Sequence, residues 1–343
     1  MKSEELYNYH REIYSGGSAN CFTGSMCKVM KLNGINIKEH IIYILGKGFK
    51  FYEEIDEFGN PKIFTKFVKM IDNFCEKYGI EMKAIDVIDS KIKEQIFNIL
   101  KEKNIIVWLN SKYLKYSDFY YSQDEGYLHA ITLEKIINKN LIRVIDSLII
   151  SAPVINCVAD IEYKYLEKAI LTDIEEPDIK NVTKKLFTLT PKESILTNIE
   201  SKILCESLYE NSVEILKDYE QDKPSAIMKF YIDCKSALDN GDESRKIWLL
   251  QRINRIIKVL WIIPNRKLLY EVILDLNLEK QEEESLLSSL EAMITNWLVL
   301  ANCCLKCSIQ TKKIDMIEEY FIDVENSEKD FWIKLEKILK RYI

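Results

Sequence analysis

The hydrophobic pattern of this 343-residue chain changes once, near Pro177. Before that point, helix-like spacing of apolar residues alternates with strand-like runs, whereas helical spacing dominates from Pro191 onward and strand-like runs are scarce. This pattern predicts an α+β fold, with a mixed domain over residues 1–177 and an α-helical domain over residues 178–343. The chain is long enough for two domains, each with its own core.

Composition restricts what such a chain binds, because a net charge of −6 argues against a nucleic-acid partner held through phosphate contacts. Nine cysteines without disulfide-scaffold spacing indicate a reducing compartment. The start of the sequence has no apolar run, so no signal peptide is predicted. The most apolar stretch, residues 293–305, is short and contains two asparagines, which favours a buried helix over a membrane span. We therefore expect a cytoplasmic protein without a membrane partner.

Cys21 stands where a glycine- and serine-rich loop, residues 14–20, meets a predicted helix over residues 21–33. A thiol at the N-terminus of a helix lies near the positive end of the helix dipole, which favours the thiolate. Backbone N–H groups of the preceding loop are suited to hold an oxyanion. Cys21 is therefore a candidate nucleophile, although a free cysteine in a folded protein is more often a small buried apolar residue.

The chain has three histidines, so the base for such a nucleophile can be sought by elimination. His10 lies in a polar segment near the start of the chain. His40 lies on a predicted helix beside two isoleucines, where a packing or surface role is expected. His129 lies in a strand-like run, residues 126–132, and is the candidate base, although a histidine on a strand is often structural.

Asp146 is the candidate partner of His129. Two strand-like runs, residues 127–133 and 141–145, flank a turn-like Asn-Lys-Asn segment and predict an antiparallel hairpin. In a hairpin the end of the second strand can lie beside the start of the first, so we expect the Asp146 carboxylate to fix the tautomer of His129. The alternative is that Asp146 is simply a turn residue.

The order Cys21, His129, Asp146 comes with two further motifs, Gly34-Ile-Asn-Ile-Lys-Glu39 and Leu45-Gly-Lys-Gly-Phe-Lys-Phe51. Together they resemble the N-terminal domain of the butirosin-biosynthesis acyltransferase family, over about residues 10–150. The resemblance implies an N-terminal domain with the fold of papain-like and bacteriocin-processing peptidases, followed by a helical C-terminal region. It also implies that the three residues form a catalytic triad.

The resemblance further implies a reaction. Members of that family transfer an acyl group from a carrier-protein thioester to an amine, through an acyl-cysteine intermediate, in antibiotic biosynthesis. We therefore expect an amide synthetase with an acyl or peptidyl carrier protein as donor and a small amine or diamine as acceptor. No metal and no cofactor is expected, beyond the phosphopantetheine that the carrier brings. A cysteine peptidase or amidase, and a catalytically inactive papain-like interaction module, are the alternatives.

The surroundings of the nucleophile depart from the papain pattern at one position. Papain-like peptidases place an oxyanion-hole glutamine about six residues before the cysteine, where this chain has Ser15. Asn20 and Ser18 are the candidate replacements, in addition to the N–H of Cys21 itself.

An aromatic run at residues 113–121 precedes the strand-like run of His129 and is expected to pack in the core or in a loop. The alternative is that it forms a wall for an aromatic or pantetheine-linked substrate.

Two other groups of residues bear on partners and metals. Carrier proteins are usually acidic, so Lys47 and Lys50, in the glycine-containing run, are candidate docking residues, with plain solvation as the alternative.

Cys303, Cys304 and Cys307 are spaced to meet on a helix. No second pair of ligands and no histidine follows them, so a buried helix is expected there rather than a zinc site.

Overall fold

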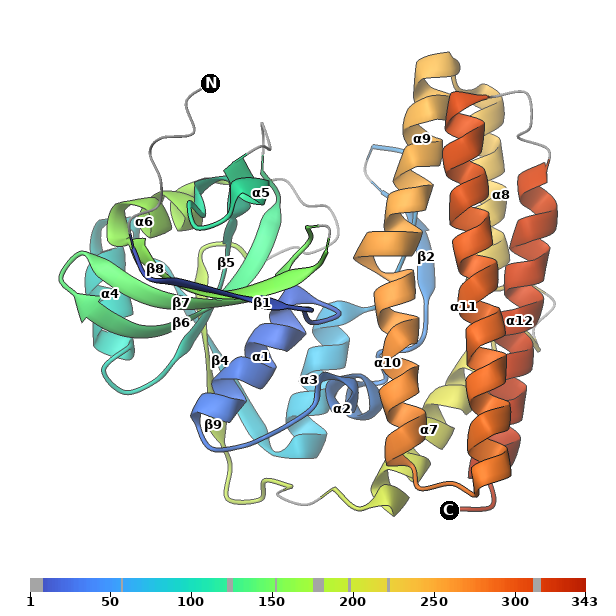
Figure 1. Ribbon diagram of the computed structural model, residues 1–343, viewed down its shortest axis with the longest axis horizontal. Helices are drawn as coiled ribbons and strands as arrows, with labels where there is room; N and C mark the ends of the chain where they lie inside the picture. The colour runs from blue at the N-terminus through green and yellow to red at the C-terminus, as the bar shows by residue number, and fades with distance from the viewer. Residues whose placement is uncertain are drawn as a thin grey trace. The chain divides into compact units, whose positions relative to one another are not determined.

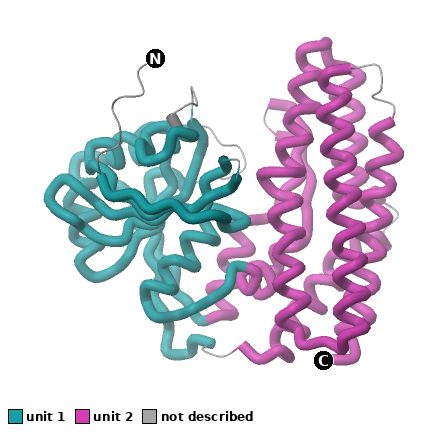
Figure 2. Tube along the Cα trace, viewed as in Figure 1, with its two compact units in different colours: residues 1–39, 79–197 teal, residues 40–78, 198–343 magenta. Residues whose placement is uncertain are grey.

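The computed structural model describes residues 9–56, 58–121, 126–151, 153–174, 182–196, 199–220, 223–310 and 316–343. It divides into two compact units: unit 1 is residues 1–39 with 79–197, and unit 2 is residues 40–78 with 198–343 (Figure 2). Unit 1 is built on a large antiparallel sheet and unit 2 is mainly helical. The prediction of an α+β fold with a helical C-terminal region is therefore confirmed.

The division of the chain differs from the predicted one. The predicted boundary, between residues 177 and 178, lies outside the described residues. Unit 1 extends to residue 197 because a strand at Lys185–Pro191 returns to the sheet, and that strand is too short and too fully buried to show a long alternating pattern. Residues 40–78 belong with the C-terminal helices, which the linear order of the sequence does not reveal.

The sheet of unit 1 has seven strands in the order β1-β8-β7-β6-β5-β9-β4, and every neighbouring pair is antiparallel (Figure 1). Strands β6 and β7 form the predicted hairpin, in which Thr132 lies opposite Ile145. The strands are β1 (Arg11–Ser15), β4 (Ile80–Asp86), β5 (Ile105–Asn110), β6 (Leu128–Asn138), β7 (Leu141–Ile149), β8 (Ile155–Glu162) and β9 (Lys185–Pro191).

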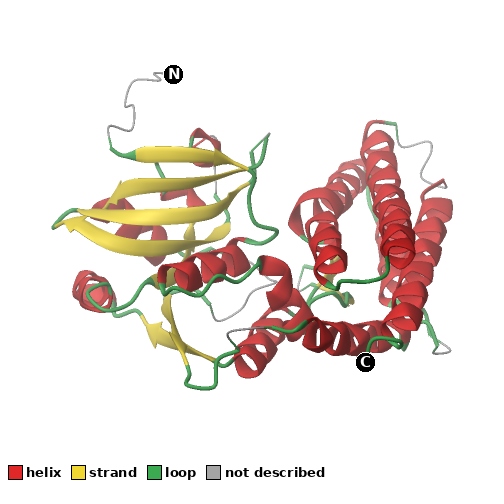
Figure 3. Ribbon diagram, turned by 60° about the horizontal axis from the view of Figure 1, so that its bottom comes forward, coloured by secondary structure: helices red, strands yellow, loops and turns green. Residues whose placement is uncertain are grey.

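Helices lie on both faces of this sheet (Figure 3). They are α1 (Cys21–Leu32), α4 (Ile92–Ile99), α5 (Asp118–Tyr121) and α6 (Tyr163–Leu171), with 3₁₀ turns at Asp89–Lys91 and Ser111–Tyr113. Side chains alternate along β5, so Val107 and Leu109 share one apolar core with α4 and α6. Trp108 points to the other face, where it stacks on Phe22 of α1 with ring centroids 5.4 Å apart.

Unit 2 is a bundle of helices with a two-stranded ribbon, β2 (Tyr52–Ile55) and β3 (Pro61–Phe64). Helical spacing in the sequence dominates from Pro191, whereas the first helix of this region begins only at Ser201, after β9. The helices are α2 (Glu39–Gly46), α3 (Phe67–Tyr78), α7 (Ser201–Leu216), α8 (Ala226–Asn240), α9 (Glu243–Arg255), α10 (Ile262–Asp275), α11 (Lys280–Ile309) and α12 (Ile317–Leu339), with a π-helical segment at Ile256–Leu260.

Hydrogen bonds hold residues 40–78 in unit 2. The main-chain oxygens of Ile44, Gly48 and Phe49 accept from side chains of α7 and α10 at 3.0, 2.9 and 2.8 Å. All the donors are buried. Since buried polar groups are costly to leave unpaired, these bonds fix the glycine-containing run against the helices.

A buried ion pair lies in the core of unit 2. Glu328 accepts from the guanidinium of Arg266 at 2.8 and 3.0 Å, and from the indole N–H groups of Trp297 and Trp332 at 2.6 and 2.9 Å. Both charged side chains are almost fully buried. The carboxylate is thus satisfied by four donors, which is the condition under which a buried charge is tolerated.

Helix α11 is long and apolar enough to cross a membrane by length and composition alone. Its most apolar face, which includes Met293, Trp297 and Leu300, is buried, and α11 packs along α9, α10 and α12. A core helix of a water-soluble bundle has the same properties, so the finding is consistent with the buried helix predicted over residues 293–305. The location of the protein in the cell stays a prediction.

Candidate active site

Helix α1 begins at Cys21, where the sequence predicts it to begin. Asn20 is the N-cap: its backbone is extended, and its side-chain oxygen accepts from the N–H groups of Phe22 at 2.8 Å and Thr23 at 3.4 Å. An asparagine is among the best residues for this position. The cap therefore sets the thiol of Cys21 in the first turn of a helix, at the positive end of its dipole.

Two hydroxyl groups of the sheet fasten α1 in place. Ser147 Oγ donates to the main-chain oxygen of Cys21 at 3.1 Å, and Thr132 Oγ1 donates to that of Ser25 at 3.3 Å. Gly24 permits the close approach, because a Cβ there would lie only 2.5 Å from Ser147 Oγ. The start of α1 is thus tied directly to β7, the strand that carries Asp146.

The three residues of the predicted triad come together in unit 1. His129 Nε2 lies 2.9 Å from Asp146 Oδ1, and since a carboxylate only accepts, the ring donates this hydrogen bond. The Cys21 side chain lies close enough to the His129 ring to contribute to the raised pKa of that ring. Because Nε2 faces Asp146, Nδ1 is the ring nitrogen left for the thiol. Cys21 is 9% exposed, His129 2% and Asp146 0%, so these three side chains are almost completely shielded from solvent.

Two tyrosines complete the surroundings of the carboxylate. Tyr116 and Tyr120 donate to Asp146 Oδ2 at 2.9 and 2.6 Å, and the Tyr120 oxygen also lies 3.0 Å from His129 Nε2. Both belong to the aromatic run at residues 113–121, for which the sequence predicts only packing or a substrate wall. The hydroxyl contacts were not predicted, since helical or strand spacing does not show where a tyrosine oxygen points.

The electrostatics of this cluster favour a protonated imidazole. Burial lowers the pKa of His129, but the charge of Asp146, its hydrogen bond and the Cys21 side chain together raise that pKa to about 10. Burial and the Asp146 charge also raise the pKa of Tyr120 well above its usual value, so its hydroxyl remains a donor. At neutral pH the ring is therefore an imidazolium between a carboxylate and a thiol, the state that supports a thiolate nucleophile.

The two candidate oxyanion-hole side chains have different surroundings. The Asn20 oxygen is committed to capping α1, which leaves its amide nitrogen, Nδ2, as a donor beside Cys21. Ser18 instead turns toward the helix: its Oγ would lie 2.1 Å from a Cβ at Gly24, and its N–H donates to Ser147 O at 2.9 Å. Of the two, Asn20 is the one whose free donor adjoins the nucleophile in the chain.

Glu39 is a residue of this site to which sequence reasoning gave no role. Its carboxylate accepts from the N–H groups of Ala19 at 2.8 Å and Asn20 at 3.0 Å, and from the hydroxyl of Thr23. The only sequence signal is its place at the end of the Gly34-to-Glu39 motif. Its contacts require the chain to turn back after α1, which no local pattern encodes.

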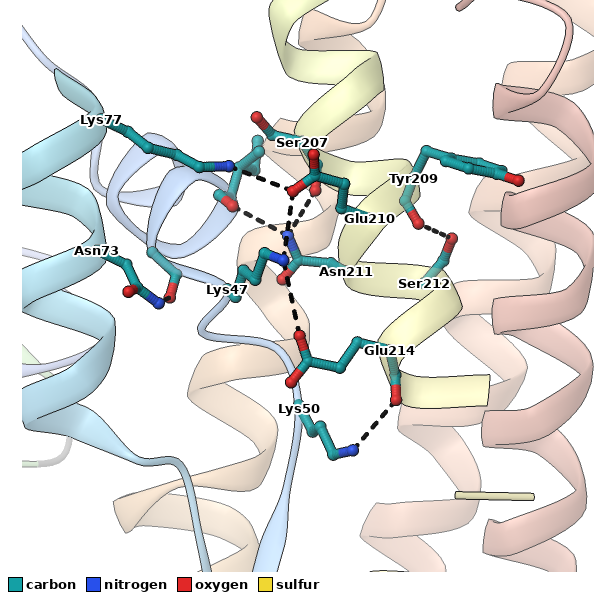
Figure 4. Close-up of polar contacts among 12 residues, drawn as sticks. Lys47, Lys50, Asn73, Lys77, Ser207, Tyr209, Glu210, Asn211, Ser212 and Glu214 are labelled. Carbon is teal, nitrogen blue, oxygen red and sulfur yellow. Dashed lines mark hydrogen bonds and ion pairs between the residues drawn. The ribbon is translucent and has the colours of Figure 1, made fainter. Parts of the chain in front are cut away.

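The two candidate docking lysines lie in unit 2 and are engaged there. Lys47 Nζ lies 3.3 Å from Glu210 and 3.7 Å from Glu214, and Lys50 Nζ lies 3.1 Å from the Glu214 main-chain oxygen (Figure 4). Lys50 Nζ also lies 2.7 Å from Asp218. A cleft of about 610 Å³ beside Lys47 is lined by charges of both signs. Docking by these lysines stays a prediction, and their ion pairs argue against it.

The other histidine and cysteine candidates play no part in this cluster. His40 is fully buried in unit 2, and its two ring nitrogens lie 2.9 Å from the carboxylates of Glu271 and Asp275 on α10. Cys303 and Cys307 lie 3.9 Å apart on α11. No group of three or more metal-ligating side chains is found in the described part of the chain.

Comparison with known proteins does not extend the resemblance stated above. No protein-family model matches this sequence, and no curated protein matches it either.

Proposed function

We propose that this protein is a cysteine-dependent acyltransferase, an amide synthetase that moves an acyl group from a carrier-protein thioester to an amine. The observation that carries the proposal is the contact chain from Cys21 through His129 to Asp146 at the start of α1. A nucleophile, a base and a group that orients the base are the three parts that acyl transfer through cysteine requires.

In the first half-reaction, the Cys21 thiolate attacks the carbonyl carbon of the thioester and a tetrahedral oxyanion forms. When this intermediate collapses, the bond from carbon to pantetheine sulfur breaks, and imidazolium His129 gives its proton to the leaving thiolate. The acyl group is then held on Cys21 as a new thioester. No ATP is needed, because the acyl group arrives already activated.

In the second half-reaction, neutral His129 takes a proton from the incoming amine as its nitrogen attacks the acyl-cysteine carbonyl. The carbon–sulfur bond breaks, the amide leaves, and the thiolate–imidazolium pair is restored. Asp146 keeps the ring in one orientation and stabilises its positive charge in both steps. Tyr116 and Tyr120 hold Asp146 in turn.

A papain-like fold for unit 1 belongs to the same proposal. Its support is a cysteine-led helix packed on an antiparallel sheet, with histidine and aspartate following in chain order on β6 and β7. The choice of donor rests on the resemblance to the butirosin acyltransferase family and on the missing papain-type glutamine at Ser15. A narrower resemblance, to closthioamide-type amide synthetases, makes an aryl-β-alanyl thioester and a diamine the first substrates to try.

Intact-mass analysis of the protein mixed with acyl-loaded carrier protein tests this function. We expect the protein to gain the mass of one acyl group on Cys21, and to lose it on addition of an amine as the amide forms. Efficient hydrolysis of peptides without any acylation by a carrier thioester would identify a peptidase instead. A chain that does neither would be an interaction module.

A further inference from the structure

The backbone N–H groups around the nucleophile are almost all occupied. Ser18 donates to Ser147 O, and the N–H groups of Ala19 and Asn20 donate to Glu39. Those of the first turn, at residues 22 and 23, donate to Asn20 Oδ1, and the next donates within the helix. Among the described residues, the Cys21 N–H is the one from 18 to 24 without an acceptor.

Two donors therefore remain at Cys21 and at the residue before it: the Cys21 N–H and the Asn20 side-chain Nδ2, since the cap engages only the Asn20 side-chain oxygen. Two converging donors are what stabilises the oxyanion of an acyl-transfer intermediate. Their directions depend on the backbone at Ala19 and Asn20, since that backbone sets where the cap side chain and the first N–H of α1 point. Glu39 is the side chain that fixes this backbone, through both of its carboxylate oxygens.

The charge of Glu39 does not serve the thiolate. A carboxylate at the N-terminus of α1 stabilises the helix dipole, yet as a like charge it opposes the negative sulfur at Cys21. If the side chain at position 39 served only to make the Cys21 thiol reactive, a neutral or basic residue would be expected there. What the carboxylate supplies is two acceptors, which bind adjacent N–H groups and the Thr23 hydroxyl at once.

We infer that Glu39 is a positioning residue, which holds Ala19 and Asn20 so that the Cys21 N–H and Asn20 Nδ2 form the oxyanion hole. This inference rests on the proposed acyl-cysteine chemistry. It separates two properties of Cys21: attack on a carbonyl needs the oxyanion hole, whereas displacement of iodide from iodoacetamide forms no oxyanion and needs only the thiolate.

The test compares these two reactions in the full chain with Glu39→Gln. The amide nitrogen of glutamine would face a backbone N–H, so one of the two anchors is lost. We expect acylation of Cys21 by p-nitrophenyl acetate, followed as the first burst of p-nitrophenolate, to slow by about 10- to 100-fold. Alkylation by iodoacetamide should keep its rate, because this displacement forms no oxyanion.

Glu81→Gln, which changes an exposed carboxylate on β4 of the same unit, is the matched control and should alter neither reaction. Glu39→Asp keeps both acceptors on a shorter side chain and should fall between wild type and Glu39→Gln. The inference is overturned if Glu39→Gln is acylated at the wild-type rate. It is also overturned if the acylation rate, the alkylation rate and the melting temperature all fall together, because the substitution would then only destabilise the fold. If Cys21→Ala gives the same burst as wild type, the acyl-cysteine chemistry itself is wrong, which is a different result.

Discussion

The side-chain hydroxyl of Ser147 donates a hydrogen bond to the main-chain oxygen of Cys21, 3.1 Å away. The residue before it, Asp146, holds the ring of His129 at 2.9 Å. Two consecutive residues of β7 therefore connect the helix that begins at Cys21 and the side chain of His129.

Substitution of Cys21 tests the nucleophile. Cys21→Ala should abolish acylation while the melting temperature stays close to that of wild type, because only a small side chain at the helix start is lost. Cys27→Ala is the matched control, about 9 Å further along α1 by the rise of 1.5 Å per residue, and should keep activity. Intact-mass measurement with a thioester donor reads both variants. The opposite pattern would make Cys27 the nucleophile.

His129 and Asp146 should act as one unit. We expect His129→Ala and Asp146→Asn each to lower the acyl-transfer rate by roughly 10²–10⁴-fold, the range for a positioned acid or base. Since Asp146 works through His129, the double variant should be little slower than the worse single one. Single-turnover rates are measured for wild type, the two single variants and the double variant. A rate loss in the double variant equal to the product of the two single losses would count against a triad.

The pH dependence of acyl transfer follows from the raised pKa of His129. The rate should hold through neutral pH and fall as the pH rises through about 10, where the imidazolium loses its proton. Asp146→Asn removes the chief cause of the raised pKa, so the alkaline limb should move to lower pH. A pH–rate profile that falls near the ordinary histidine value in both proteins would contradict this electrostatic description.

The same pKa makes a prediction about stability. A group whose pKa is raised on folding stabilises the folded state fully below its unfolded value, and this contribution is lost as the pH rises through the folded value. For His129 the window runs from its ordinary 6.5 to about 10. The melting temperature of wild type should therefore decline over this window more than that of Asp146→Asn, as measured by circular dichroism at fixed ionic strength.

The buried pair in unit 2 should dominate the stability of the helical bundle. Glu328→Ala leaves the Arg266 guanidinium buried without its carboxylate, and we expect the free energy of unfolding to fall by about 3–5 kcal/mol. Glu284→Ala, which removes the exposed partner of Lys280 on α11, is the control and should change little. Urea unfolding of both variants measures the difference, and equal losses would mean that the buried pair adds nothing.

Lys50→Glu separates docking from stability. The new carboxylate would face Asp218 and the Glu214 main-chain oxygen, so we expect a lower melting temperature and little effect on the KM for a loaded carrier. Lys50→Gln removes the charge with less repulsion and serves as the milder variant. A raised KM for the carrier in Lys50→Gln, with unchanged KM for a small pantetheine thioester, would support the docking prediction.

Local signals carried most of what was predicted correctly. The glycine- and serine-rich loop and the apolar spacing after it predict α1 and its first residue, because a cap and a hydrophobic stripe are encoded within one helix. The turn between β6 and β7 is likewise local. Helical spacing from Ile63 to Tyr78 predicts one helix, and α3 occupies Phe67–Tyr78, so only the start is wrong: residues 63–64 belong to β3, which pairs with β2. Strand pairing there overrides the weak helical pattern.

Non-local contacts account for what was missed in the site. The Glu39 contacts depend on the loop that follows α1, and the contacts of Tyr116 and Tyr120 depend on where the turn at residues 115–116 and the short helix α5 direct the two rings. Neither periodicity nor composition specifies such directions. The arrangement of Cys21, His129 and Asp146 could be predicted because the chain has few histidines. The chain order and the predicted hairpin then selected His129 as the candidate base and Asp146 as its partner.

The position of β9 between β5 and β4 has a consequence for how the sheet is completed during synthesis. Strand β4 is made early, but among the described strands its partner in the sheet is β9, which leaves the ribosome much later. The pairing of β4 therefore requires closure of a long loop. Until then Ile106 and Val107 of β5 lack their partners on that side. A polypeptide ending at residue 177 would keep the whole triad and still lack the strand that joins β4 to the sheet.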